Sequence, residues 1–202
     1  MHAVVGIGRG TEVTVPESGP FLGGAHGDPP FTVSFDGGAR IVDGQPVAGA
    51  CAVLWTCTVR SGASDDSGWS RCAVATAALP LERSPGVAEA WGLRLALTLL
   101  GRVGDGERRA RVVGDNLAVI RYGAAQGRLH NPSMEALVAP LLGRLALGGW
   151  ALDFAAVRRR FNSVADGGAT EALMAARRRL DDGRVAPYVE CRWARDGEPP
   201  LA

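Results

Sequence analysis

The sequence predicts an α/β fold in which a five-stranded mixed sheet carries helices on both of its faces. Three strand-like segments follow one another between residues 31 and 78, before the first helix-like segment begins. From residue 84 onward, helix-like and strand-like segments alternate. Strands joined by hairpins form an antiparallel meander, whereas strands joined through helices pair in parallel. We therefore expect three antiparallel strands and two parallel ones.

Short-range patterns place the first three strands. In residues 31–36, Phe31, Val33 and Phe35 alternate with polar residues, which is the period of a half-buried strand. Gly37 and Gly38 are expected to end that strand. The second and third strands are predicted at 47–59 and 69–78, joined by a hairpin loop at 62–68 that is rich in glycine, serine and aspartate.

The first helix has a recognisable beginning and end. Ser84 is a favoured N-cap residue and Pro85 suits the first helical position, so we predict a helix from Ser84-Pro85 to Leu100, before the glycines at 101–106. Beyond it we expect a strand at 109–114, helices at 116–125 and 133–147, a strand at 150–157 and a helix at 164–180.

The composition of the chain predicts its domain boundaries and the cellular compartment of the protein. The glycine- and proline-rich residues 1–30 are expected to be a leader or linker, 31–182 the folded domain, and 183–202 a C-terminal tail. No apolar run approaches the roughly 18 residues that a membrane span needs, and residues 1–30 lack the pattern of a signal peptide. We expect an intracellular protein, cytoplasmic or nuclear, that is neither secreted nor embedded in a membrane.

The charged residues exclude some chemistries. The sequence contains no lysine, which excludes Schiff-base catalysis and the lysine of nucleotide-binding P-loops. The net charge is only +1, so any contact with nucleic acid must come from local patches. The four cysteines form no CxxC pair and match no familiar zinc pattern.

Four acidic residues fall where one sheet could gather them. Glu89 shares a helical stripe with Leu93 and Leu100, the face expected to pack on the sheet, where an unpaired carboxylate would be costly. Asp36 ends the first strand, Asp115 follows the fourth, and Asp166 lies in the first turn of the last helix. Each has a simpler explanation: a turn aspartate for Asp36, a helix N-cap for Asp115, and a helix-dipole contact for Asp166 and Glu89.

Taken together, the four acids predict a metal centre. Magnesium prefers oxygen ligands, and two such ions about 4 Å apart need roughly this many carboxylates. In such a pair, one ion activates the attacking water and the other stabilises the leaving oxygen of a phosphodiester. We therefore predict that Asp36, Glu89, Asp115 and Asp166 bind two Mg²⁺ ions, with Mn²⁺ as a possible substitute.

Five segments also resemble ribonuclease H domains, in particular their reverse-transcriptase-like branch found in retroelements and their cellular relatives. The segments are FDGGAR at 35–40, AGACAVL at 48–54, VAEA at 87–90, VVGDN at 112–116 and VRRRFNSVAD at 157–166. The resemblance spans about residues 31–180 and keeps the four acids in the family's order. It departs from the family's pattern in three places: no histidine precedes the last helix, Asn116 replaces a serine, and residues 41–46 replace the usual turn.

The resemblance implies cleavage of the RNA strand of an RNA–DNA hybrid, with structured RNA as another partner and protein partners unknown. It implies catalytic and metal-binding roles for the four acids. It also implies substrate contacts at Gly37, Gly38, Asn116, Arg160 and Asn162. The alternative hypothesis is a non-catalytic module for RNA binding or for ribonucleoprotein or retroelement assembly. A third is another nuclease or a recombinase of the same fold.

Overall fold

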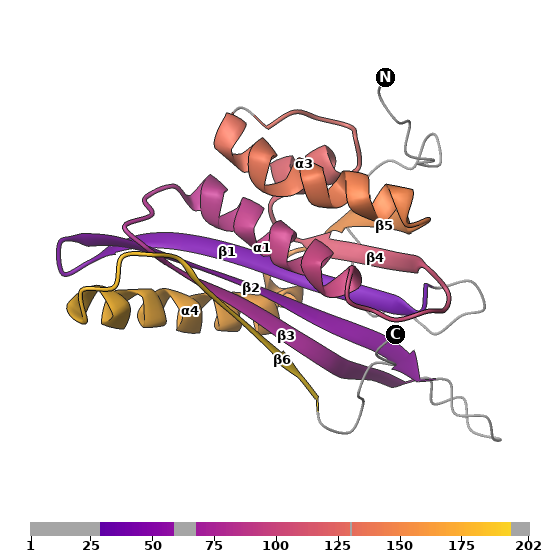
Figure 1. The fold of residues 1–202 in the computed structure, drawn as a ribbon, viewed down its shortest axis with the longest axis horizontal. Helices are drawn as coiled ribbons and strands as arrows, with labels where there is room; N and C mark the ends of the chain where they lie inside the picture. The colour runs from indigo at the N-terminus through magenta and orange to yellow at the C-terminus, as the bar shows by residue number, and fades with distance from the viewer. Residues whose placement is uncertain (1–28, 59–67, 130, 195–202) are drawn as a thin grey trace.

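The computed structural model describes residues 29–58, 68–129 and 131–194. Within these residues the strands form one six-stranded sheet in the order β5-β4-β1-β2-β3-β6 (Figure 1). The strands are β1 (Phe31–Val42), β2 (Gln45–Thr58), β3 (Gly68–Pro80), β4 (Arg109–Gly114), β5 (Ala151–Ala156) and β6 (Tyr188–Trp193). The helices are α1 (Pro85–Leu100), α2 (Leu117–Gly123), α3 (Pro132–Leu147) and α4 (Ser163–Asp181), and a short 3₁₀ helix, η1 (Arg159–Phe161), precedes α4.

The predicted mixed sheet is confirmed. Strand β2 pairs antiparallel with both β1 and β3, whereas β4 pairs in parallel with β1 and with β5. Helix α1 begins as expected, because the Ser84 hydroxyl accepts a hydrogen bond of 3.3 Å from the Val87 amide and Pro85 follows the cap. Among the described helices, none combines the length and the apolarity needed to cross a membrane.

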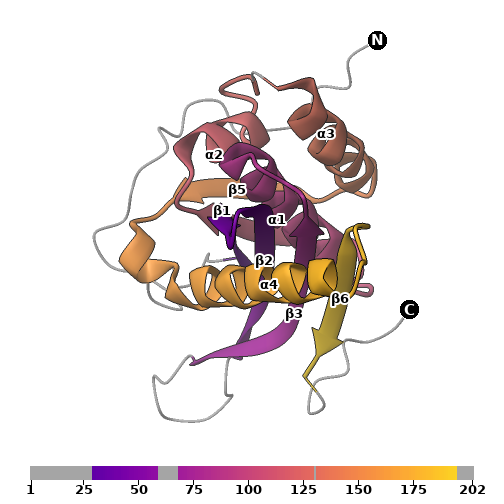
Figure 2. The same cartoon turned by 90° about the vertical axis from the view of Figure 1, so that its left-hand side faces the viewer.

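Helices cover both faces of the sheet, also as predicted. Along β2, Ala50, Ala52 and Leu54 belong to the main core with the leucines of α1, whereas the intervening Cys51 and Val53 pack with Ala169 of α4. Side chains of a strand alternate between its two faces, so α1 and α4 lie on opposite sides. Figure 2 shows α1, α2 and α3 grouped together and α4 apart from them, running across the strands.

The first strand is longer than predicted. Gly37 and Gly38 do not end it: they pair with Ala50 and Gly49 of β2, and β1 continues to Val42. The reversal comes at Asp43 and Gly44, whose φ angles of 49° and 75° suit a tight hairpin turn. The expectation that two glycines break the strand was wrong because both keep their pairing with β2, and Gly37 instead allows the backbone of α1 to approach β1, as described below.

The sheet also gains a sixth strand from the segment predicted as a tail. Strand β6 pairs antiparallel with β3 at the edge of the sheet, and the Ala194 amide donates a 2.8 Å hydrogen bond to the Cys72 carbonyl. Pro187 lies just outside β6, where a proline costs no sheet hydrogen bond. Residues 1–28 and most of the predicted loop at 62–68 lie outside the described part of the chain.

Candidate metal centre

Three of the four predicted acids converge at one point. Asp36, Glu89 and Asp115 each offer a carboxylate oxygen, and these oxygen atoms all lie within 4.8 Å of one another. Asp36 comes from β1, Glu89 from the start of α1, and Asp115 from the residue after β4. The three residues are far apart in the sequence, so the fold itself assembles the cluster.

Sheet pairing and a helix contact bring these acids together. Strands β1 and β4 run in parallel with Ser34 opposite Val113, so two residues further along Asp36 of β1 lies beside Asp115, which directly follows β4. Helix α1 then packs with its backbone close to β1. A β-carbon on Gly37 would lie 2.1 Å from the Ala88 carbonyl oxygen, and one on Gly92 would lie 2.6 Å from the Asp36 carbonyl oxygen. This backbone contact brings Glu89 to Asp36.

Asp115 does not cap helix α2. The N-cap of α2 is Asn116, whose side-chain oxygen accepts hydrogen bonds from the amides of Ala118 at 3.1 Å and Val119 at 3.3 Å. The simpler explanation of Asp115 as the N-cap is therefore wrong by one residue. The Asp115 carboxylate faces the other acids instead, since its charge raises the pKa of both Asp36 and Glu89.

Burial and the charges of neighbouring acids raise the pKa of two of these acids. Asp36 is 4% exposed. Burial, followed by the charges of Asp115 and Asp166, raises its pKa from 3.8 to about 7. For Glu89, burial and the charges of Asp36 and Asp115 raise the pKa from 4.5 to about 9, although a hydrogen bond from Asn116 and the charge of Arg159 oppose this shift. Such clustered carboxylates favour a bound cation.

The donor set fits a hard divalent cation. All the converging ligand atoms are carboxylate oxygens, which magnesium and manganese prefer over softer metals. The Glu89 Oε2 atom is buried and finds no hydrogen-bond partner within the described residues. A buried carboxylate oxygen without a partner is costly, and a cation would satisfy it.

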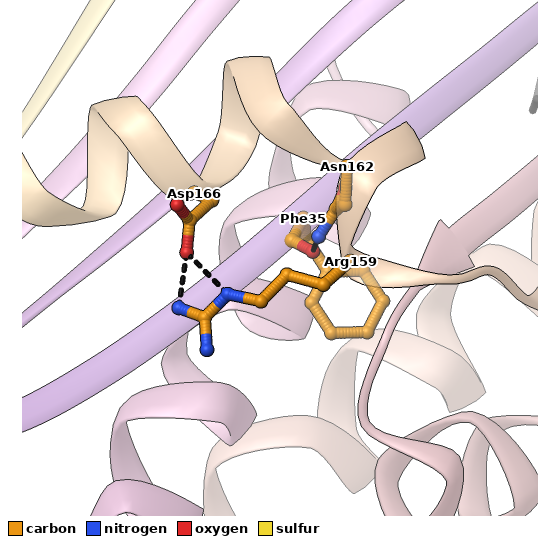
Figure 3. A network of polar contacts seen from close by, with 4 residues as sticks. All are labelled: Phe35, Arg159, Asn162 and Asp166. Carbon is orange, nitrogen blue, oxygen red and sulfur yellow. Dashed lines mark hydrogen bonds and ion pairs between the residues drawn. The ribbon is translucent and has the colours of Figure 1, made fainter.

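The fourth acid lies beside this cluster with a cationic partner. The Asp166 Oδ1 atom accepts a 3.0 Å hydrogen bond from Arg159 Nε and a second from Arg159 Nη2 (Figure 3). Its charge nevertheless reaches Asp36 and raises the pKa of that carboxyl. The sequence placed Asp166 near the other acids but did not reveal the pairing with Arg159.

The architecture can be compared with known proteins. No protein-family profile matches the sequence, and no curated protein matches it either. Solved structures do match. The N-terminal ribonuclease H domain of Rv2228c from Mycobacterium tuberculosis, solved as a fusion with maltose-binding protein, has 24% sequence identity and a TM-score of 0.55, covering 74% of this chain and 97% of that one. The chain has a ribonuclease H-like fold.

Two further structures support this fold. Ribonuclease H1 of the halophilic archaeon Halobacterium salinarum NRC-1 has 22% identity and a TM-score of 0.52 over 72% of this chain and 98% of that one. LC11-RNase H1, solved in complex with an RNA/DNA hybrid, has 24% identity and a TM-score of 0.53 over 72% and 98% of the two chains. Since these chains are covered almost completely, the described domain contains nearly the whole ribonuclease H-like fold.

The residues predicted to contact substrate on this fold have different surroundings. Gly37 is buried against α1, whereas a β-carbon on Gly38 would meet nothing within 4 Å. The Arg160 guanidinium is exposed and lies 4.7 Å from the centre of the Phe161 ring. Asn116 caps α2. Asn162 is 2% exposed and donates a 2.8 Å hydrogen bond to the Phe35 carbonyl, which makes it an anchor between α4 and β1 (Figure 3).

The raised pKa values of Asp36 and Glu89 predict how the stability of the ribonuclease H-like domain depends on pH without metal. The folded state keeps protons that the unfolded chain loses near pH 3.8 and 4.5. The stabilisation given by these retained protons is therefore complete below pH 3.8 for Asp36 and below pH 4.5 for Glu89. It is lost as the pH rises through about 7 for Asp36 and about 9 for Glu89. In chelator at about pH 9, Glu89→Gln should be more stable than the unmodified protein by about 1–3 kcal/mol.

Thermal unfolding in chelator from about pH 5 to about pH 9 measures this difference. The variant Glu107→Gln, which changes an exposed glutamate, serves as the control and should follow the unmodified protein. Magnesium should raise the Tm of the unmodified protein but not that of Glu89→Gln. Equal pH dependence in Glu89→Gln and in the unmodified protein would contradict the proposed repulsion.

Proposed function

We propose that this chain is a metal-dependent endonuclease that hydrolyses the RNA strand of RNA–DNA hybrids. The observation that carries the proposal is the convergence of the Asp36, Glu89 and Asp115 oxygen atoms within 4.8 Å on a ribonuclease H-like fold. A structure of this fold, LC11-RNase H1, was solved with an RNA/DNA hybrid, which supports the same class of substrate here. The motifs at 112–116 and 157–166 further favour the reverse-transcriptase-like branch.

The roles of the acids follow from their positions. Asp36 faces both Asp115 and Asp166, since both charges act on it, so it would contribute to two neighbouring cation positions. Glu89 and Asp115 would complete the first position, and Asp166 the second. When bound, the two cations supply the positive charge that activates the attacking water and stabilises the leaving oxygen, so that cleavage leaves a 3′-hydroxyl. Asp36 and Glu89 lose their protons as they become ligands.

Recognition of the hybrid would depend on shape. An enzyme of this kind contacts 2′-hydroxyls and phosphates along the minor groove and does not read base edges. The exposed Arg160 lies in η1, directly before the helix that carries Asp166, and is suited to bind a phosphate. The small net charge of +1 indicates that such local contacts, rather than a global field, would hold the substrate.

A cleavage assay tests the proposal. Purified protein is incubated with labelled RNA–DNA hybrid, double-stranded RNA, single-stranded RNA and double-stranded DNA, each with magnesium, with manganese and with chelator. We expect cleavage of the hybrid's RNA strand only, and only with metal. Asp115→Asn should remove it, whereas Asp105→Asn, which changes an exposed aspartate, should not. Cleavage that persists in Asp115→Asn would refute the site.

The pairing of Asp166 with Arg159 favours a second candidate, a non-catalytic RNA-binding module, because this acid is already neutralised by the protein itself. In that case the same assay would give no cleavage with either metal. Binding to hybrid or structured RNA would persist in chelator and would be insensitive to Asp115→Asn.

A further inference from the structure

The side chain of Arg159 faces the whole acidic cluster. It donates two hydrogen bonds to Asp166, at 3.0 Å through Nε and also through Nη2. Its charge also lowers the pKa of Glu89, and the charges of Asp36 and Asp115 add to that of Asp166 in raising the pKa of Arg159 itself. A single guanidinium therefore interacts with all four acids predicted to hold metal.

The fold holds Arg159 at this position. Arg159 begins η1 and Asp166 lies in the first turn of α4, so the two residues flank the junction between these helices. Asn162 lies within that junction, and its side-chain amide donates a 2.8 Å hydrogen bond to the carbonyl of Phe35, the residue before Asp36 (Figure 3). Because Asn162 is 2% exposed, this hydrogen bond ties the junction firmly to β1 beside the cluster.

The ion pair between Arg159 and Asp166 is weak enough for a cation to displace Arg159. The Arg159 side chain is 69% exposed and that of Asp166 is 33% exposed, so water and salt screen the interaction. A divalent cation carries twice the charge and coordinates carboxylate oxygens directly. It can therefore replace the guanidinium at Asp166 when its concentration is sufficient.

We propose that Arg159 is a tethered counter-charge that competes with the second cation for Asp166. In the substrate-free protein, Asp36, Glu89 and Asp115 bind one cation while Arg159 occupies Asp166, and the second cation binds only after the guanidinium has moved away. The inference rests on the proposed metal centre and adds a positioning residue that sets how much metal the site requires.

Metal binding without substrate tests this competition. Isothermal titration calorimetry and electron paramagnetic resonance with Mn²⁺ give the number of bound ions and their affinities. Arg159→Ala should bind the second ion about three- to tenfold more tightly, because a screened charge pair no longer competes. Arg159→Lys keeps the charge and should stay within about twofold of the unmodified protein. Arg158→Ala removes the same charge one residue away and should also stay within about twofold.

A double-mutant cycle identifies the partner of Arg159. In an Asp166→Asn background, Arg159→Ala should no longer increase the affinity. Unchanged, weaker or absent binding of the second ion in Arg159→Ala would overturn the proposal, as would an Arg159→Lys variant that binds as tightly as Arg159→Ala. These readouts need no catalysis. If the expected changes in Mn²⁺ affinity are observed but the hybrid is never cleaved, the competition between Arg159 and the second cation stands and the proposed function fails.

Discussion

Asp36→Asn is expected to lower the single-turnover rate of hybrid cleavage by about 10³-fold or more. Asp36 is 4% exposed and lies close to Glu89 and Asp115, and the charge of Asp166 also acts on it, so in the proposed metal centre it would contribute to both cation positions. Metal charge stabilises such a transition state by several kcal/mol, and each 1.4 kcal/mol corresponds to about a tenfold change in rate. Replacing this ligand with a neutral amide should therefore remove most of the catalysis.

The same substitution separates catalysis from folding. Asparagine has nearly the same shape as aspartate but no charge, so it removes both the burial of a charge and the repulsion from neighbouring acids, which together raise the pKa of Asp36. The metal-free variant should melt at or above the temperature of the unmodified protein at neutral pH, and magnesium should no longer raise its Tm. Asp105→Asn, with the same change at an exposed loop position, should retain both cleavage and the magnesium effect. If Asp36→Asn cleaved the hybrid at a rate within about tenfold of that of the unmodified protein, the loss would be no more than about 1.4 kcal/mol of transition-state stabilisation. That result would contradict the role assigned to Asp36.

The sheet and most of its helices could be predicted because they follow from periodic patterns. Residues 31–36 alternate as a strand, and Ser84 with Pro85 begins α1 in the expected way. The helical stripe that contains Glu89 correctly indicated that this carboxylate turns toward the sheet. Periodicity identifies which face of an element is buried, and three of the four acids predicted to meet on this basis do lie together.

Other features depend on contacts that periodicity does not encode. The cap of α2 is Asn116 rather than Asp115, because the choice between neighbouring residues depends on how the chain turns at the end of β4. Strand β6 forms because the exposed edge of β3 accepts it, despite its flanking proline. The ion pair between Arg159 and Asp166 depends on η1, an irregular turn that no sequence period predicts.

The glycine expected to end β1 instead brings β1 and α1 together. Gly37→Ala is predicted to destabilise the protein by about 3 kcal/mol or more, because the added β-carbon would lie 2.1 Å from the Ala88 carbonyl oxygen and 2.4 Å from the Glu89 amide nitrogen. Backbone atoms cannot rotate away as a flexible side chain can, so α1 must shift as a whole. That shift would carry Glu89 away from Asp36, and affinity for a single Mn²⁺ ion should fall together with stability.

Gly38→Ala is the matched control for this effect. A β-carbon there would meet nothing within 4 Å, and alanine is better tolerated than glycine inside a strand by roughly 0.5–1 kcal/mol. Denaturant unfolding should therefore place Gly38→Ala at or slightly above the unmodified protein and Gly37→Ala well below it. If the two variants had equal stability, or if Gly37→Ala lost stability but kept its full Mn²⁺ affinity, the backbone contact between β1 and α1 would not be what positions Glu89.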